Sequence, residues 1–268
     1  MKLDRFILNY DGNKYLETRK HLTDFIKNNH YELIAEPYCG IFGFSRAFYE
    51  LQPNNNYEIW LNDIDPDLIN FLKQLMENPE EIINRINDTI NKYPTDAELT
   101  KAYRKCDDVD MIKSIFRTSG YYLLSLQKGK LKIKNYLEKL NDYKIFFKNV
   151  KLFNMDADDF IKLVVEKNVK TLIYYDPPYF QSSNTSYTEY YRKYNEHGDI
   201  DNYKDGTSMY VSIYEMFKNN DNPNISLLFV MNKIDIINFL FKKYFYKNYE
   251  GKYQNHGKNK KRHVVYYK

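Results

Sequence analysis

The sequence predicts a doubly wound α/β fold with a mostly parallel sheet. Two observations predict it. Short apolar runs alternate with amphipathic segments along most of the chain, and the first strand–helix–strand unit contains a glycine turn and ends in an acid. The expected strands lie at residues 33–35, 57–61, 150–153, 171–175, 226–231 and 263–267, with later helices at 155–166 and 233–244.

The beginning of the chain is expected to form a βαβ unit after a leading helix. Apolar residues near one face predict that helix over residues 14–29. Strand 33–35 then runs into a turn that contains Gly40, and a helix over 44–51 leads to the second strand, which ends at Asp63. Parallel strands need such a helical crossover, so this unit indicates a parallel sheet.

Residues 72–150 interrupt the alternation and are expected to form a mainly helical insertion. Pro79, preceded by an asparagine cap and followed by acids, is typical of a helix start. Thr95 and Glu98 have the spacing of a capping box, and a further helix is expected over 110–126. The predicted division is one α/β domain formed by residues 1–71 and 151–268, with 72–150 inserted into it.

Composition restricts the class of protein. The 268-residue chain carries a net charge of +4 and has a pI near 8.6, which permits a polyanionic partner. Cys39, Cys106 and the five histidines show no spacing typical of a disulfide framework or a metal site, so no metal is expected. Without a secretory segment or a long apolar stretch, the protein is expected to be intracellular, in the cytoplasm or with nucleic acid, not secreted and not in a membrane.

The residues Asp176-Pro177-Pro178-Tyr179 close an expected strand and suit methyl transfer to an exocyclic amino group of a nucleobase. Such an amine is a poor nucleophile because its lone pair is delocalised into the ring. The Asp176 carboxylate and the Pro177 carbonyl would accept its two N–H bonds, and the proline rings fix the direction of the backbone. Tyr179 would stack on the extruded base.

A cofactor site is expected at the first glycine turn. Gly40 allows the backbone to approach a ligand closely, and Asp63 at the next strand end is suited to accept the hydroxyls of a ribose. This arrangement fits any adenosine-containing cofactor, NAD as well as S-adenosylmethionine. The neighbouring Asp176 motif favours a cofactor site over a merely structural turn.

Together these motifs resemble the Dam-like adenine-specific DNA methyltransferases. Tyr10 to Lys14 is similar to that family's N-terminal Trp-Ala-Gly-Gly-Lys, and Glu36 to Gly40 to its Glu-Pro-Phe-x-Gly turn. The resemblance implies the Rossmann-like fold of a class I methyltransferase. It also implies S-adenosylmethionine as the cofactor, with its binding residues at Tyr10, Lys14, Glu36, Pro37, Gly40, Asp63, Asp156 and Asp176.

The chain departs from the family pattern at three places. Phe42 stands where the family has a second glycine, and the histidine that often follows the catalytic loop is missing unless His197 takes its place. The family's DNA-reading hairpin is not recognisable. The nearest feature is the lysine-rich stretch around Lys130 and Lys132, in the insertion that is the candidate target-recognition region. These lysines, with Tyr179 and Phe180 on the base, are the expected substrate-binding residues. The polar stretch 181–210 suits a lid or nucleic-acid groove as well as an ordinary surface loop.

The predicted activity is transfer of a methyl group from S-adenosylmethionine to the 6-amino group of adenine in DNA. Two alternatives stay open. Adenine in RNA or the 4-amino group of cytosine would suit the same tetrapeptide. A catalytically silent methyltransferase fold that serves as a nucleic-acid-binding scaffold is the non-enzyme alternative.

Overall fold

The structure is a computed structural model of the whole chain, and it describes residues 1–7, 14–53, 56–95, 97–98, 134–178, 206–251 and 261–268. The predicted helix over 110–126 and the lysine-rich stretch lie outside the described residues. None of the helices in the described ranges is both long and apolar enough to cross a membrane.

One sheet of seven strands organises the described part of the chain, in the order β3-β2-β1-β4-β5-β7-β6. The strands β1 to β5 pair in parallel, and β7 pairs antiparallel with both β5 and β6. The mostly parallel doubly wound sheet is therefore confirmed. The strands are β1 (Leu33–Glu36), β2 (Glu58–Asn62), β3 (Val150–Phe153), β4 (Thr171–Tyr175), β5 (Ile225–Asn232), β6 (Phe245–Gly251) and β7 (Lys261–Tyr267).

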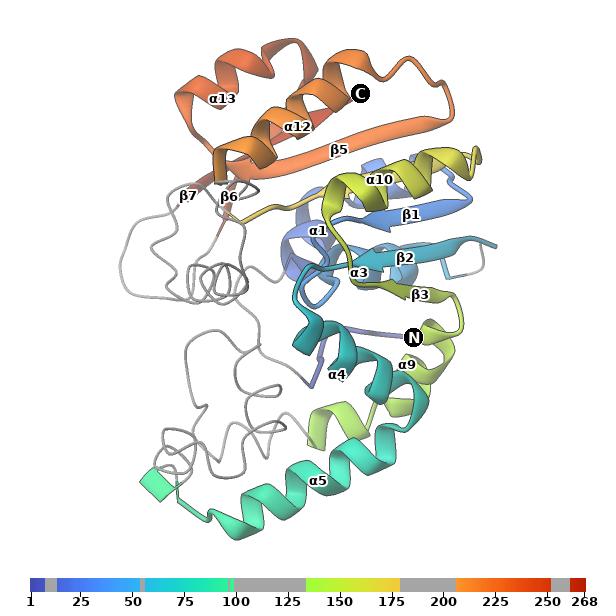
Figure 1. Cartoon of the computed structure of the whole chain (residues 1–268), viewed down its shortest axis with the longest axis vertical. Coiled ribbons are helices and arrows are strands. Elements are labelled where there is room, and N and C mark those ends of the chain that lie inside the picture. The colour runs from blue at the N-terminus through green and yellow to red at the C-terminus, as the bar shows by residue number, and fades with distance from the viewer. Residues whose placement is uncertain (8–13, 54–55, 96, 99–133, 179–205, 252–260) are drawn as a thin grey trace, which may run out of the picture.

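Helices cover both faces of the sheet because each strand of its parallel part alternates between two hydrophobic clusters. In β4, Tyr174 belongs to the first cluster and Tyr175 to the second. The first cluster contains side chains of α2, α3, α4, α5 and α9, and the second contains side chains of α10, α12 and α13. Figure 1 shows α4 and α5 at the β3 end of the sheet and α12 and α13 near β5. The helices are α1 (Tyr15–His21), α2 (Thr23–Asn28), α3 (Gly43–Leu51), α4 (Pro66–Glu77), α5 (Pro79–Lys92), α9 (Leu140–Phe147), α10 (Ala157–Glu166), α12 (Gly206–Asn219) and α13 (Asp235–Leu240).

The expected leading helix is divided in two. Leu22, with φ −114° and ψ 7°, separates α1 from α2. The Thr23 hydroxyl donates to the Arg19 carbonyl four residues earlier, a type of bond that competes with the helical ladder and bends helices. Leu22 itself is buried in the first cluster, so packing favours the bend.

Helices α4 and α12 and strand β6 lie where the sequence analysis named no element, and α12 begins inside the polar stretch 181–210. Helix α9 lies within the expected helical insertion 72–150, although no individual helix was predicted at its residues. Helix α12 forms because Tyr210, Ile213 and Phe217 recur on one face and are buried in the second cluster. The helix expected over 233–244 ends early, as α13 followed by a short 3₁₀ turn at Lys242–Tyr244.

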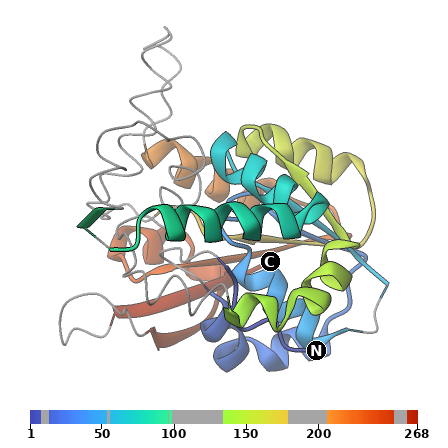
Figure 2. The ribbon, with the colours of Figure 1, turned by 90° about the horizontal axis from the view of Figure 1, so that it is seen from below.

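The described helices of the 72–150 segment share the core of the sheet. Ile82 and Ile86 of α5 and Phe146 of α9 lie in the same hydrophobic cluster as Leu3 and Phe42. Lys144 Nζ lies 2.6 Å from Glu80 Oε1, and Figure 2 shows α5 crossing this end of the molecule with α9 beside it. The capping box is confirmed, since the Glu98 N–H donates to Thr95 Oγ1 at 3.2 Å and the Thr95 N–H donates to Glu98 Oε2 at 3.1 Å. The division into a domain and an insertion stays a prediction.

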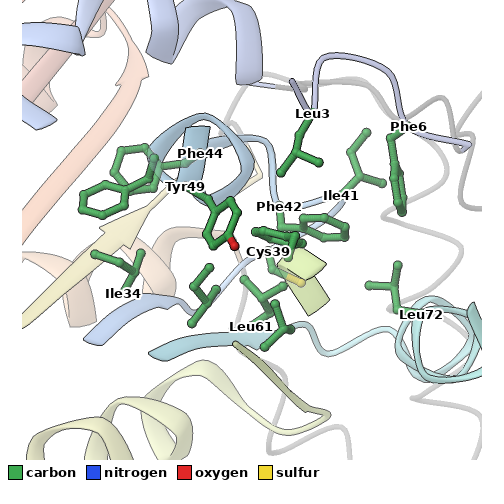
Figure 3. Packing of buried hydrophobic residues seen from close by; sticks show 14 of the residues in the cluster. Leu3, Phe6, Ile34, Cys39, Ile41, Phe42, Phe44, Tyr49, Leu61 and Leu72 are labelled. Carbon is green, nitrogen blue, oxygen red and sulfur yellow. The ribbon is translucent and has the colours of Figure 1, made fainter. Parts of the chain in front are cut away.

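Phe42 adopts the left-handed conformation that glycine favours. Its φ is 45° and its ψ 46°, immediately before α3, so the backbone here takes a glycine-like shape without glycine. The ring is fully buried, 4.9 Å from the Phe6 ring centroid and 5.7 Å from that of Phe146, and the Arg46 guanidinium lies 5.6 Å away. Figure 3 shows Phe42 inside this cluster, close to Leu3 and Phe6 of the N-terminal segment. Core packing therefore offsets a backbone cost of about 1–2 kcal/mol.

Replacing Phe42 should separate these two contributions. Phe42→Ala loses the ring and keeps the Cβ cost, so we expect a loss of about 3–5 kcal/mol in the free energy of unfolding. Phe42→Gly relieves the backbone and should be about 1 kcal/mol more stable than the alanine variant. Urea unfolding measures both.

Phe48, fully buried in the interior of α3, is the matched control. There glycine should be less stable than alanine by roughly 0.5–1 kcal/mol. The same order of the two variants at both positions would contradict the strain at Phe42.

Candidate functional site

The carboxyl ends of β1, β2 and β4 carry most of the predicted site. After β1 the chain adds β2 and β3 on one side of that strand and then crosses over to add β4 on its other side. The order of the strands therefore reverses between β1 and β4, and open α/β sheets bind ligands at the carboxyl ends of the strands at such a reversal. The described site residues are Lys14, Glu36, Pro37, Gly40, Asp63, Asp156, Asp176, Pro177 and Pro178. Tyr10, Tyr179, Phe180, Lys130 and Lys132 lie outside the described residues.

Asp63 connects the turns that follow β1 and β2. Its Oδ2 accepts a hydrogen bond from the Gly40 N–H at 3.0 Å, and its Oδ1 accepts one from the Asp65 N–H at 3.1 Å. Burial raises the pKa of the Asp63 carboxyl to about 6, although these backbone donors oppose the shift. Gly40 has φ 48°, a conformation that suits glycine. The Ile64 backbone also bonds this carboxylate, so three of its four lone-pair sites are used and one can still accept from a ligand hydroxyl.

Asn62 joins three strand ends and was not singled out by the sequence analysis. Its Nδ2 donates to the Pro37 and Met155 carbonyls, both at 3.0 Å, and its Oδ1 accepts from the Met155 N–H at 3.1 Å. The side chain is fully buried. Asn62 therefore fixes the loop after β1 against the loop after β3. The signal in the sequence that could have identified Asn62 is its position directly before Asp63, the acid that follows the second strand.

Asp156 caps a helix at the end of β3. Its carboxylate accepts from the Asp158 N–H at 2.9 Å, and α10 begins at the next residue, Ala157. The neighbouring Asn154 donates to the Asp63 carbonyl at 2.9 Å. The predicted cofactor residue Asp156 thus lies at a helix start, and the loop that contains it is joined to the Asp63 loop.

Glu36 ends β1 and caps α3. Its Oε1 accepts from the Ser45 N–H at 2.8 Å in the first turn of that helix, and the residue is only 2% exposed. Burial raises the pKa of the Glu36 carboxyl to about 8, and the negative charge of Asp176 contributes in the same direction. The predicted cofactor residue Glu36 therefore also fixes the start of α3.

Asp176 is paired with Lys14, which lies 162 residues earlier in the chain. Lys14 Nζ lies 3.3 Å from Asp176 Oδ2, and the Lys14 side chain is 5% exposed. Lys14 immediately precedes α1, and Glu17 follows one turn later on the same helix. Two predicted site residues that are far apart in sequence are thus brought into contact.

Glu17, Tyr249 and His263 extend this polar group. The Tyr249 hydroxyl donates to Glu17 Oε2 at 3.2 Å, and His263 Nε2 lies 3.9 Å from Glu17 Oε1. The Tyr249 ring stacks on His263 with centroids 5.2 Å apart. Burial raises the pKa of the Glu17 carboxyl. The positive charge of Lys14 opposes this shift, and the negative charge of Asp176 adds to it. The sequence analysis missed Tyr249 and His263 because they lie on β6 and β7, far from Lys14 in sequence. It also missed Glu17, although its position three residues after Lys14, one helical turn away, was a signal that the two side chains lie on the same face.

The segment after Asp176 is also held by the protein. Pro177 is buried, Pro178 is partly buried, and the Pro178 carbonyl accepts a hydrogen bond from the Tyr210 hydroxyl at 2.9 Å. Among the described residues no group of three or more His, Cys, Asp or Glu side chains could hold a metal ion.

The strand order, the parallel core and the reversed final hairpin are those of a Rossmann-like class I methyltransferase fold. Residues 10–123 match the family model of the D12 class N6 adenine-specific DNA methyltransferases, so the predicted resemblance to Dam-like enzymes is confirmed.

Two further likenesses are weaker. The chain is 24% identical over 188 residues to the type II methyltransferase M1.LlaDCHI of Lactococcus lactis subsp. cremoris, a match that covers 61% of this chain and 62% of that relative. The chain thus spans less than two thirds of the length of this curated relative. The crystal structure of PH0851 superimposes on 94% of this chain and 45% of its own, with 10% identity and a TM-score of 0.39, which supports no argument.

The proton on Glu36 should make stability depend on pH. The folded carboxyl has a pKa of about 8 against an ordinary value of 4.5, so between these values unfolding releases a proton. The contribution of Glu36 to the free energy of unfolding should therefore fall as pH rises from about 4.5 to about 8, by up to about 1.4 kcal/mol per pH unit.

Urea unfolding of the wild type and Glu36→Gln at pH 5.5, 6.5 and 7.5 measures this. The amide keeps an oxygen for the Ser45 N–H and does not titrate. The free energy of unfolding of the wild type should fall relative to that of Glu36→Gln as pH rises. A wild-type free energy of unfolding that stays constant or rises relative to that of the variant would contradict the buried proton.

Proposed function

We propose that this protein transfers a methyl group from S-adenosylmethionine to the 6-amino group of adenine in DNA. The observation that carries the proposal is the Asp176–Lys14 pair at the carboxyl end of β4, followed directly by two prolines. The match of residues 10–123 to an adenine-specific family supports the same activity.

The chemistry proposed for Asp176 is that of a fixed acceptor. Its carboxylate and the Pro177 carbonyl accept the two N–H bonds of the amine and draw its nitrogen toward tetrahedral geometry as it attacks. The Lys14 ammonium lies 3.3 Å from Asp176 and so holds the carboxylate in a fixed position for this role. S-adenosylmethionine, when bound, supplies an activated methyl group on a sulfonium. The protein then contributes mainly position and orientation.

The residues present fit such a cofactor. Gly40 has no Cβ where a ligand would approach the first turn, and the Asp63 carboxylate beside it suits the ribose hydroxyls. Glu36, Pro37 and Asp156 complete the proposed set at the neighbouring strand ends, with Lys14 and Asp176 close to the reacting methyl group. Tyr10 is proposed to join them.

The proposed substrate is an adenine extruded from duplex DNA. Extrusion costs a few kcal/mol of stacking and pairing, which contacts in the pocket must offset. Tyr179 and Phe180 are proposed to hold the ring, and Lys130 and Lys132 to contact phosphates. The net charge of +4 is compatible with a polyanion.

Removing the acceptor carboxylate should stop the reaction. We expect Asp176→Ala to lower the single-turnover rate of methyl transfer by at least about 10²–10³-fold, because an acceptor for the reacting amine is lost. The Kd for S-adenosylmethionine, measured by calorimetry, should rise much less than the rate falls, because Asp176 is only one of the eight proposed cofactor residues.

Asp159→Ala is the control, since Asp159 is a surface carboxylate 64% exposed and paired with Lys162. It should keep the wild-type rate. Near-normal methyl transfer by Asp176→Ala would refute the proposed role of Asp176.

The acceptor base can be identified with tritium-labelled cofactor. We expect label in duplex DNA that contains adenine and none in duplexes without it. Label in RNA alone, or in DNA that has cytosine and no adenine, would replace the proposed acceptor by one of the two alternatives. The absence of cofactor binding at millimolar concentration would favour a silent scaffold.

A further inference from the structure

The segment Asp176 to Pro178 is held from both faces of the sheet. On the face of the first hydrophobic cluster, Lys14 contacts the Asp176 carboxylate at 3.3 Å. On the face of the second cluster, the Tyr210 hydroxyl donates to the Pro178 carbonyl at 2.9 Å. Pro177, whose carbonyl is the proposed second acceptor, lies between these two anchors.

The position of the Tyr210 hydroxyl is itself fixed by packing. Tyr210 is 5% exposed, and its ring centroid lies 6.2 Å from that of Phe229 in β5. It belongs to α12, which Ser212 connects to Asp158 of α10 through a 3.2 Å hydrogen bond. The hydroxyl therefore reaches the segment from a helix packed on the sheet.

Proline alone does not fix the direction of these carbonyl groups. The pyrrolidine ring restricts φ, but ψ is free to change within the extended region, and rotation about ψ of Pro177 re-aims the carbonyl of that residue. An anchor at Asp176 and another at the Pro178 carbonyl restrict that rotation from both ends. A hydrogen bond at this point therefore preorganises an acceptor in addition to stabilising the fold.

We propose that Tyr210 is a positioning residue that aims the Pro177 carbonyl by anchoring the carbonyl of Pro178. The proposal rests on the proposed methyl transfer to an amino group. The Tyr210 hydroxyl acts through the backbone of the segment and contacts neither the amine nor the cofactor.

The test compares Tyr210→Phe with Tyr244→Phe. The Tyr244 hydroxyl donates to the Phe217 carbonyl at 2.8 Å, and its side chain is buried in the same hydrophobic cluster. Both variants thus lose one buried hydroxyl that donates to a main-chain carbonyl, so their melting temperatures should fall by similar amounts. Of these two hydroxyls, that of Tyr210 bonds the segment after Asp176 and that of Tyr244 does not.

Two readouts distinguish positioning from stability. The single-turnover rate of methyl transfer should fall about three- to tenfold in Tyr210→Phe, the effect of one hydrogen bond, with the Kd for S-adenosylmethionine unchanged within twofold. Amide exchange at Asp176, followed by mass spectrometry, should become faster in the same variant. Tyr244→Phe should match the wild type in both.

Equal rates in the two variants, or a slower rate in Tyr210→Phe without faster exchange at Asp176, would overturn the proposal. A wild-type protein that transfers no methyl group would refute the proposed function instead. The exchange comparison would still decide the anchor in that case: faster exchange in Tyr210→Phe alone supports it, and equal exchange overturns it.

Discussion

The ion pair between Lys14 and Asp176 is the interaction on which the rest of the site depends. Moving two charges out of water is costly, and breaking such a pair by removing one partner typically costs about 3–5 kcal/mol. Lys14 is nearly buried and Asp176 is 16% exposed, so the pair fixes the start of α1 against the end of β4. The same contact joins the N-terminal motif to the proposed acceptor, and Glu17 brings the β6–β7 hairpin to it.

A second set of contacts makes separate strand ends into one surface. Asn62 binds the loops after β1 and β3, and Asp63 binds the Gly40 turn. Glu36 fixes the first turn of α3 from the strand side. These groups are polar and mostly buried, and each accepts or donates bonds to the main chain. The loops that carry the proposed cofactor residues are thereby held by the sheet, which is how a rigid scaffold preorganises a site.

Much of the fold could be predicted because it follows from local pattern. The runs 150–153 and 171–175 were predicted as strands and form β3 and β4 with the same bounds, and the glycine turn and terminal acid gave the first βαβ unit. Helix α9 and strand β6 were missed because the buried faces of both are set by partners distant in sequence. Tyr143 of α9 donates to the Leu3 carbonyl, and Tyr249 of β6 stacks on His263. Phe42 shows the same dependence, since its glycine-like backbone is maintained by rings from α9 and the N-terminal segment.

The sequence by itself determined the alternating elements, the order of the motifs and the Asp-Pro-Pro segment, because these depend on spacing along the chain. Only the tertiary structure decided that Lys14 pairs with Asp176, that Asn62 joins the loops after β1 and β3, and that the Tyr210 hydroxyl donates to the Pro178 carbonyl. These contacts join residues 25 to 162 positions apart, and the burial that strengthens them exists only once the sheet has brought its strand ends together.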